Sequence, residues 1–175
     1  MPRTSLLASI GAVARSVGAD AKNPKWTSYG ALELDIFCPT HADLETFLAA
    51  AKPIAGTEFV TDLNKASGYL ADDENLSNAR RLFNAERYWE CHEVLEGLWR
   101  QKGGEEKRVL QGIILVCAAY VHHQKGEDKV ALGVLRRAIQ QLDYPHGNYG
   151  GFNLSRLKRE VDGALANGRF RVFEV

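Results

Sequence analysis

The chain has 175 residues, of which 45% are hydrophobic and 25% are charged, a composition typical of soluble globular proteins with a buried core. Its 22 Lys and Arg residues balance its 22 Asp and Glu residues, so no excess charge indicates a nucleic acid or a membrane as a partner. The same balance favours self-association. The three Cys residues are well separated and form no C-x-x-C motif, which argues against a disulfide framework or a zinc–thiolate site and favours a reducing cytoplasm.

The first predicted element is a helix near the N-terminus. Its apolar residues, from Leu6 to Val17, fall within a narrow arc at about 100° per residue, the pattern of a packed amphipathic helix. Arg3 followed by apolar residues also resembles a weak signal peptide, but the apolar part is short and is interrupted by Ser9 and Gly11. We therefore expect a folded helix. No apolar run in the chain approaches the roughly 20 residues needed to span a bilayer.

Residues 1–73 are predicted to form a small α+β unit. After a loop over residues 18–29, the sequence alternates from residue 31 to residue 38, which places every second side chain on one face of a strand. Thr40 then provides an N-cap for a helix, and residues 57–63 predict a second strand. This order of helix, strand, helix and strand suggests a partial ferredoxin-like unit, in which the crossover makes the two strands parallel if they are adjacent.

The remaining chain predicts a compact helical bundle, which makes the fold class α+β overall and mostly α. The polar residues 71–75 mark the boundary, residues 76–168 form the bundle, and residues 169–175 form an extended C-terminal arm. Five helices are expected near residues 76–85, 87–101, 105–124, 128–142 and 154–167. The third is apolar around its whole circumference from Ile113 to Val121, so other helices must surround it.

The predicted helix at 87–101 carries one His and three nearby Glu residues. On a helical wheel, His92 and Glu96 are four residues apart and stack on one edge of the apolar face. Glu90 and Glu93 lie on a different side, roughly opposite that face. One helix therefore cannot bring all four groups to a single point.

The buried helix offers partners for the first of these pairs. Gln111 and His122 share one of its stripes, where an unpartnered amide or imidazole would be costly, so each is expected to be hydrogen-bonded. The nearest available partners lie on the edge formed by His92 and Glu96. The structural polar cluster expected from this contact comprises His92, Glu96, Gln111 and His122, with Tyr88 and Trp99 beside it.

Two interpretations of these residues stay open. Two His and one carboxylate can bind zinc or non-haem iron, so His92, Glu96 and His122 are candidate ligands of a divalent metal. Glu90, His92, Glu93 and Glu96 are candidate catalytic residues, because imidazole and carboxylate groups transfer protons near neutral pH. The spacing, however, lacks the second His of the zincin motif and differs from the E-x-x-H of di-iron bundles. The other interpretation is a Glu–His pair that fixes the register of the packed helices.

The string that contains these residues is also specific as a motif. Its first part comprises Phe83, Asn84, Tyr88, Trp89, Glu90, His92, Glu93, Leu95, Glu96 and Trp99. Its later parts comprise Leu110, Gln111, Gly112, Ile113 and Ile114, then Ala118 and His122, and finally Gly126, Ala131 and Leu132. With these residues, the stretch 76–142 resembles the uncharacterised all-α family called domain of unknown function 309.

The resemblance implies a small helical bundle and no activity that can be transferred. Two positions depart from the family's pattern. Glu86 stands where the family usually has Gly, which predicts that the turn between the two helices is not left-handed. Leu115 stands where a second Gln would be, which weakens any site that needs that amide.

The sequence thus leaves two functions open, and it does not decide whether the protein is an enzyme. In the first, the bundle is an interaction or scaffold module that binds a protein partner or a second copy of the chain. Trp89, which lies off the apolar face, marks an interface or a contact between domains. In the second, it is a metal-dependent or acid–base enzyme, hydrolase-like, that uses the H-E-x-x-E helix and His122. The first is favoured because buried polar networks often specify only packing.

Overall fold

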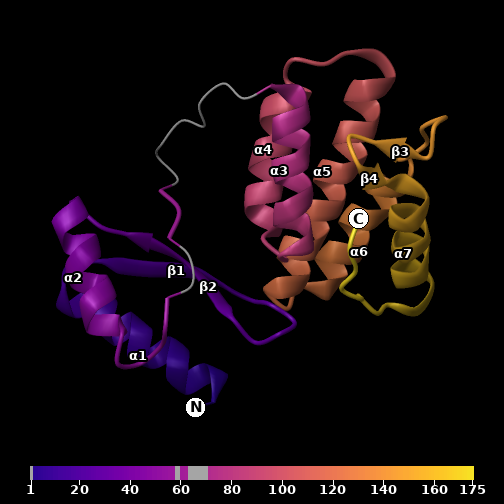
Figure 1. The fold of residues 1–175 in the computed structure, drawn as a ribbon. Coiled ribbons are helices and arrows are strands. Elements are labelled where there is room, and N and C mark those ends of the chain that lie inside the picture. The colour runs from indigo at the N-terminus through magenta and orange to yellow at the C-terminus, as the bar shows by residue number, and fades with distance from the viewer. Residues whose placement is uncertain (1, 58–59, 63–70) are drawn as a thin grey trace. The chain divides into compact units, whose positions relative to one another are not determined.

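A computed structural model describes residues 2–57, 60–62 and 71–175 of the chain, which divides into two units, residues 1–67 and 68–175 (Figure 1). The helices and strands of the first unit are α1 (Arg3–Ser16), β1 (Asp20–Trp26), β2 (Leu32–Phe37) and α2 (His41–Ala51). Those of the second are α3 (Asp72–Asn84), α4 (Tyr88–Trp99), α5 (Gly104–Gln124), α6 (Asp128–Ile139), β3 (Asn148–Tyr149), β4 (Phe152–Asn153) and α7 (Leu154–Asn167). The chain is therefore α+β and mostly α, as predicted.

The N-terminal unit consists of a β-hairpin and two helices. β1 and β2 pair in antiparallel fashion, with Asp20 opposite Phe37 and Trp26 opposite Leu32. α1 packs against β1 and α2. The small core between them comprises Ile10, Ala14, Ala19, Phe47 and Ala51, with the inner side chains of β2 against it. Thr40 caps α2 through a capping box with Asp43, as the sequence predicted.

The described residues of this unit run in the order helix, strand, strand and helix rather than the expected helix, strand, helix and strand, and their strand pair is antiparallel. Residues 20–26 were expected to lie in a loop, yet they form β1, which is held by its pairing with β2. The pairing is irregular between Lys22 and Lys25, where Pro24 lacks a backbone donor. Of the strand expected at 57–63, the described residues 57 and 60–62 are not in a strand, and the others lie outside the described residues.

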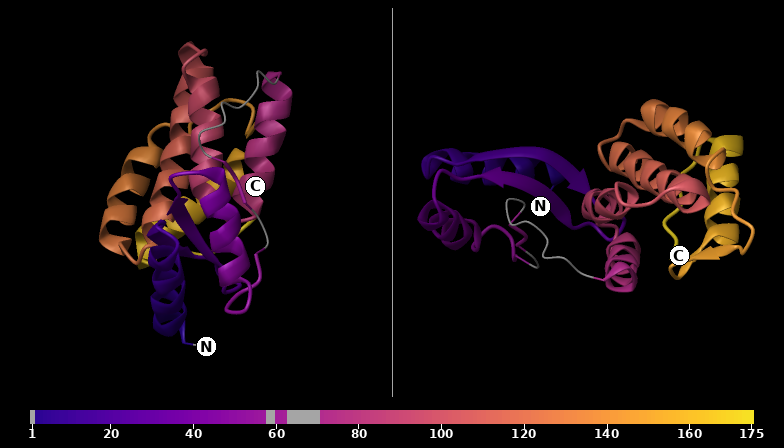
Figure 2. Two further views of the ribbon diagram at one scale, coloured as in Figure 1. Left: turned by 90° about the vertical axis from the view of Figure 1, so that its left-hand side faces the viewer. Right: turned by 90° about the horizontal axis from the view of Figure 1, so that it is seen from above.

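The C-terminal unit packs its five helices in chain order. α3 contacts α4, α4 contacts α5, α5 contacts α6, and α6 contacts α7, and Figures 1 and 2 show these neighbours within the unit. α5 is buried along most of its length, from Val109 to Val121, as its uninterrupted apolar sequence predicted. An aromatic cluster of Phe83, Tyr88 and Tyr120 joins α3, α4 and α5, and ring centroids within it are 4.8–6.2 Å apart.

The turn between α3 and α4 corrects one expectation. Glu86 adopts a left-handed conformation with φ of 58°, although it replaces the family's usual Gly. A side chain in this conformation costs about 1–2 kcal/mol, and two hydrogen bonds offset the cost. The backbone N–H of Arg87 donates to the carbonyl of Leu82 at 2.9 Å, and Gln124 Nε2 donates to the carbonyl of Glu86 at 2.9 Å. The left-handed turn thus forms without a glycine.

A short hairpin and an extended segment complete the unit. Gly150 and Gly151, both with positive φ, form the two-residue turn between β3 and β4. Asn153 caps α7 by accepting a hydrogen bond from the backbone of Arg156 at 2.9 Å, and Gly168 ends α7 with φ of 69°. Within the described ranges, none of the helices has the length and apolar content needed to cross a membrane.

Candidate functional site on helix α4

Helix α4 divides the candidate residues between its inner and outer sides. Tyr88, Cys91, Leu95 and Leu98 point into the core and are at most 2% exposed. Trp89, His92, Glu93 and Glu96 lie on the outer side, whereas Val94 packs against the edge of the core. Trp89, at 37% exposed, is the large apolar residue of this outer side.

His92 lies near the surface, where its imidazole ring contacts side chains of its own helix. Its side chain is 17% exposed, and its ring lies parallel to the Trp89 indole, with ring centroids 5.4 Å apart and an interplanar angle of 7°. Nδ1 lies 3.3 Å from Glu93 Oε1, and Nε2 lies 4.0 Å from Glu96 Oε1. Glu96 also accepts a hydrogen bond from Arg100 Nη2 at 3.0 Å. The imidazole is therefore held against an indole and between two carboxylates of its own helix.

The partners expected from the buried helix are elsewhere. His122 Nδ1 lies 2.5 Å from Glu127 Oε2, at the junction of α5 and α6, rather than near His92. The reason is the rotation of α5: Cys117 is the residue that meets Cys91 on α4, and His122, five positions later, is turned about 140° away from it. Gln111 is half-buried on the same stripe as His122. Among the described residues, neither Gln111 nor His122 forms a hydrogen bond with His92 or Glu96.

The other candidate residues also separate. Glu90 forms a two-point ion pair with Arg87, with Nε to Oε1 at 2.8 Å and Nη2 to Oε2 at 2.5 Å, and so stabilises the first turn of α4. Trp99 is packed against the core edge, and Lys107 Nζ lies 4.2 Å from the centroid of its ring. Tyr88 lies inside the aromatic cluster. The structural polar cluster expected from the sequence is therefore distributed over separate places.

These positions bear directly on the metal hypothesis. Of the three candidate ligands, only His92 and Glu96 are near each other. In the part of the chain that the structure describes, no group of three or more His, Cys, Asp or Glu side chains is arranged to hold a metal ion. What the arrangement on α4 offers instead is an imidazole whose two nitrogens each face a carboxylate of the same helix.

The sequence did not reveal that two thiols and a phenol lie close together in the core on the inner side of α4. The Sγ atoms of Cys91 and Cys117 are 3.4 Å apart, and the Tyr88 hydroxyl has no hydrogen-bond partner among the described residues. Burial, and next the neighbouring Tyr120, raise the pKa of Tyr88 well above its ordinary value. Burial also raises the pKa of the Cys91 thiol. The place of these groups on the apolar face of the helices gave no sign of a polar site in the sequence.

Comparison with known proteins identifies the family. Residues 76–134 match the family described as a domain of unknown function (DUF309). The segment 76–134 belongs to this family. A solved structure of a conserved hypothetical protein from Thermus thermophilus is 35% identical in sequence, and the match covers 56% of this chain and 99% of that one, with a TM-score of 0.45.

A curated relative extends beyond this domain. It is an uncharacterised protein of Aquifex aeolicus (strain VF5), 23% identical over 107 residues, which are 61% of this chain. The match spans about a third of that relative's own length, 32%. The family motif can now be placed on the structure: its Phe83, Tyr88 and Leu95 build the core, and its Trp89 and His92 lie on the outer side of α4. The motif thus contains both residues that pack in the core and residues that form part of the protein surface.

Proposed function

We propose that the C-terminal unit is an interaction module that binds a second copy of the chain through the outer side of α4. The observation that carries the proposal is the Trp89 indole, more than a third exposed and fixed in orientation by its parallel contact with His92. A large aromatic side chain of restricted mobility gives a contact much apolar area at a small entropic cost, which is why Trp dominates the energy of many interfaces.

One pair of groups on this side of α4 suits a two-fold contact, which brings the same surface of both copies together. In an antiparallel pair of α4 helices centred between residues 94 and 95, Trp89 of one copy lies opposite Arg100 of the other. The Arg100 side chain is 71% exposed and could stack on that indole. The zero net charge of the chain opposes association less than a large net charge would.

Sedimentation velocity of the full chain over a range of concentrations tests the proposal. The expected result is a concentration-dependent dimer, which Trp89→Glu converts to a monomer. Val130→Glu is the matched control, because Val130 is also an exposed apolar residue of the unit and lies on α6. A chain that stays monomeric up to about 1 mM would refute the proposal, because its dimer would then have a binding free energy weaker than about 4 kcal/mol. So would a dimer that both variants retain.

The alternative, an acid–base or metal-dependent enzyme, is favoured by one observation, the position of the His92 imidazole between Glu93 and Glu96. A carboxylate beside one ring nitrogen orients an imidazole for proton transfer at the other. Metal analysis of protein purified without an affinity tag, with thermal shifts in Zn, Mn, Fe and Ni, tests it. Stoichiometric metal that is lost in His92→Ala would support the enzyme, and a His92→Ala variant that changes only stability would count against it.

A further inference from the structure

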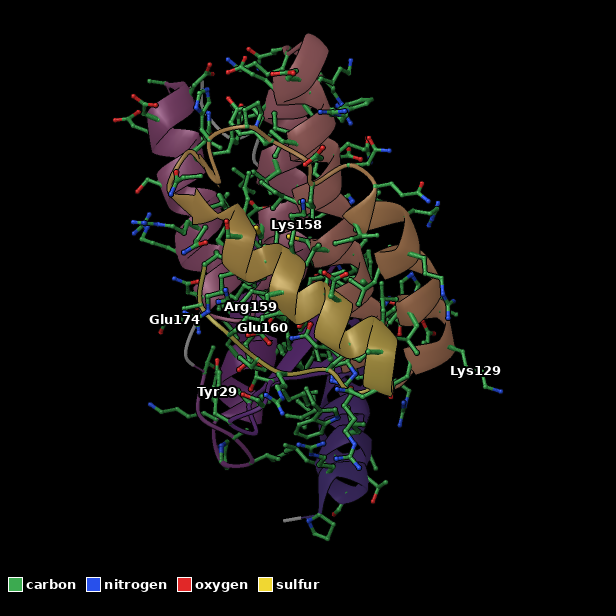
Figure 3. The ribbon with its side chains drawn as sticks, turned by 90° about the vertical axis from the view of Figure 1, so that its right-hand side faces the viewer. Tyr29, Lys129, Lys158, Arg159, Glu160 and Glu174 are labelled. Carbon is green, nitrogen blue, oxygen red and sulfur yellow. The ribbon has the colours of Figure 1, made fainter. Side chains whose placement is uncertain are left out.

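A hollow of about 300 Å³ lies between the second half of α7 and the residues that follow it. Three of its lining residues are arginines: Arg159 on α7, and Arg169 and Arg171 on the C-terminal segment. Figure 3 shows Arg159 on α7 beside this segment. Gly163 contributes no side chain, and an added Cβ there would meet nothing within 4 Å, so the hollow stays open on the helix side. Its volume is at the lower end of the range for small-molecule pockets.

The arginines of the C-terminal segment are held in place by their neighbours. Phe170 stacks on His123, with ring centroids 4.3 Å apart, and Phe173 is buried against the aromatic cluster. Between them, the Tyr120 hydroxyl donates a hydrogen bond to the carbonyl of Arg171 at 2.7 Å. The backbone on both sides of Arg171 is thus fixed to α5 while its side chain lines the hollow. A site fixed before binding loses less entropy when a ligand arrives.

The positive charge of the hollow is not neutralised. None of the guanidinium groups of Arg159, Arg169 and Arg171 takes part in an ion pair or hydrogen bond with another described residue. One carboxylate, that of Glu160, lines the same hollow, so three positive charges face one negative charge. In a chain with equal numbers of acidic and basic residues, three unpaired arginines around one concavity are a local excess. Guanidinium groups bind phosphate oxygens through two parallel hydrogen bonds, which Lys cannot do.

From this geometry we infer that the hollow binds a small ligand that carries a phosphate monoester. Arg171, from its fixed backbone, and Arg159, from α7, bind the phosphate oxygens from two sides, and Arg169 adds its charge. Glu160 lies in the same lining and accepts a hydrogen bond from a hydroxyl or amino group elsewhere on the ligand. The site is separate from the outer side of α4 and does not depend on the function proposed there.

Titration calorimetry of the full chain with phenyl phosphate and with inorganic phosphate, at low salt, tests the site. The expected result is saturable binding of one phenyl phosphate per chain with a Kd below about 1 mM. Arg159→Gln and Arg171→Gln each weaken binding about tenfold, because each removes a charge-assisted contact. Arg136→Gln, which removes an exposed charge from α6, leaves the Kd unchanged.

A fourth variant separates the hollow from its charge. Gly163→Leu fills the hollow and keeps every arginine, so it weakens phenyl phosphate binding more than inorganic phosphate binding. Three results would overturn the inference: no saturable binding, an equal loss of affinity in Arg136→Gln, or binding only of DNA or anionic vesicles without phosphate monoesters. The last result would assign the arginines to a macromolecule. Thermal unfolding of each variant shows that the fold persists.

Discussion

Replacing Tyr88 with Phe should make the protein more stable, although it removes a polar group from the family motif. The Tyr88 side chain is 1% exposed, and within the described ranges its hydroxyl has no hydrogen-bond partner. In the unfolded chain the same hydroxyl is hydrogen-bonded to water. Folding therefore carries a desolvation cost that the Phe variant does not have.

The size of the effect follows from opposing contributions. A buried, unsatisfied polar group costs about 1–3 kcal/mol, and this cost disappears in Tyr88→Phe. The space left by one oxygen costs a few tenths of a kcal/mol, at about 24 cal/mol per Å³. The ring keeps its contacts with Phe83 and Tyr120, at centroid distances of 5.1 and 4.8 Å. The free energy of unfolding should rise by about 1 kcal/mol, and the Tm of the unit by about 4 °C.

The same substitution at Tyr120 should have the opposite sign. Its hydroxyl donates to the carbonyl of Arg171, so Tyr120→Phe loses a hydrogen bond and should lower the free energy of unfolding by about 1 kcal/mol. Urea unfolding of both variants, followed by circular dichroism, measures the pair. A Tyr88→Phe variant that is destabilised as much as Tyr120→Phe would refute the reasoning, because it would mean that the Tyr88 hydroxyl has a partner such as a buried water.

Three further predictions concern single positions. Gly150→Ala should destabilise the protein by about 2 kcal/mol or more in the same urea assay, because φ is +54° and the new Cβ would lie 2.6 Å from an atom of Leu76. Gly97→Ala should stabilise the protein by up to about 1 kcal/mol, because Gly97 lies within α4 and an added Cβ there meets no other atom within 4 Å. Burial, and next the charge of Glu106, raise the pKa of Tyr149 to about 12, so the folded state binds the phenol proton more tightly than the unfolded state does. The free energy of unfolding should therefore fall as the pH rises from about 10 towards 12. In the Tyr149→Phe variant it should fall less over the same pH range. A thiol reagent should modify only Cys38 in the native protein at pH 8 and all three cysteines after unfolding, since the other two are fully buried between α4 and α5.

The sequence predicted those elements whose side chains alone determine them. α5 was predicted almost to the residue because its apolar stretch has no exposed side, and the start of α2 because Thr40 and Asp43 form a local cap. β1 was missed because nothing within residues 20–26 favours a strand; its partner, β2, supplies the hydrogen bonds. The left-handed turn at Glu86 was missed for a related reason, since Gln124, 38 residues away, stabilises it.

For the candidate site as well, the sequence predicted the contacts within one helix and missed those between helices. The spacing of His92 and Glu96 predicted their proximity on one helix, and their side chains are 4.0 Å apart. The contact with His122 required the rotation of α5 relative to α4, which is set by how the core packs around the Cys91–Cys117 contact. No pattern within α5 contains that information. Arg159, Arg169 and Arg171 were not recognised either, because the segment after α7 is positioned by aromatic contacts with α3 and α5.

The two surfaces proposed here depend on the core to different degrees. The C-terminal segment is held by Phe173 against Phe83 and by the Tyr120 hydroxyl, and the backbone N–H of Val175 donates to Asn84 Oδ1 at 2.9 Å. Loosening any of these contacts should displace the arginines of this segment, Arg169 and Arg171, without unfolding α4. The stack of Trp89 on His92 is formed within α4 and should survive. Tyr120→Phe should therefore weaken phenyl phosphate binding while self-association persists, which separates the two proposals in a single variant.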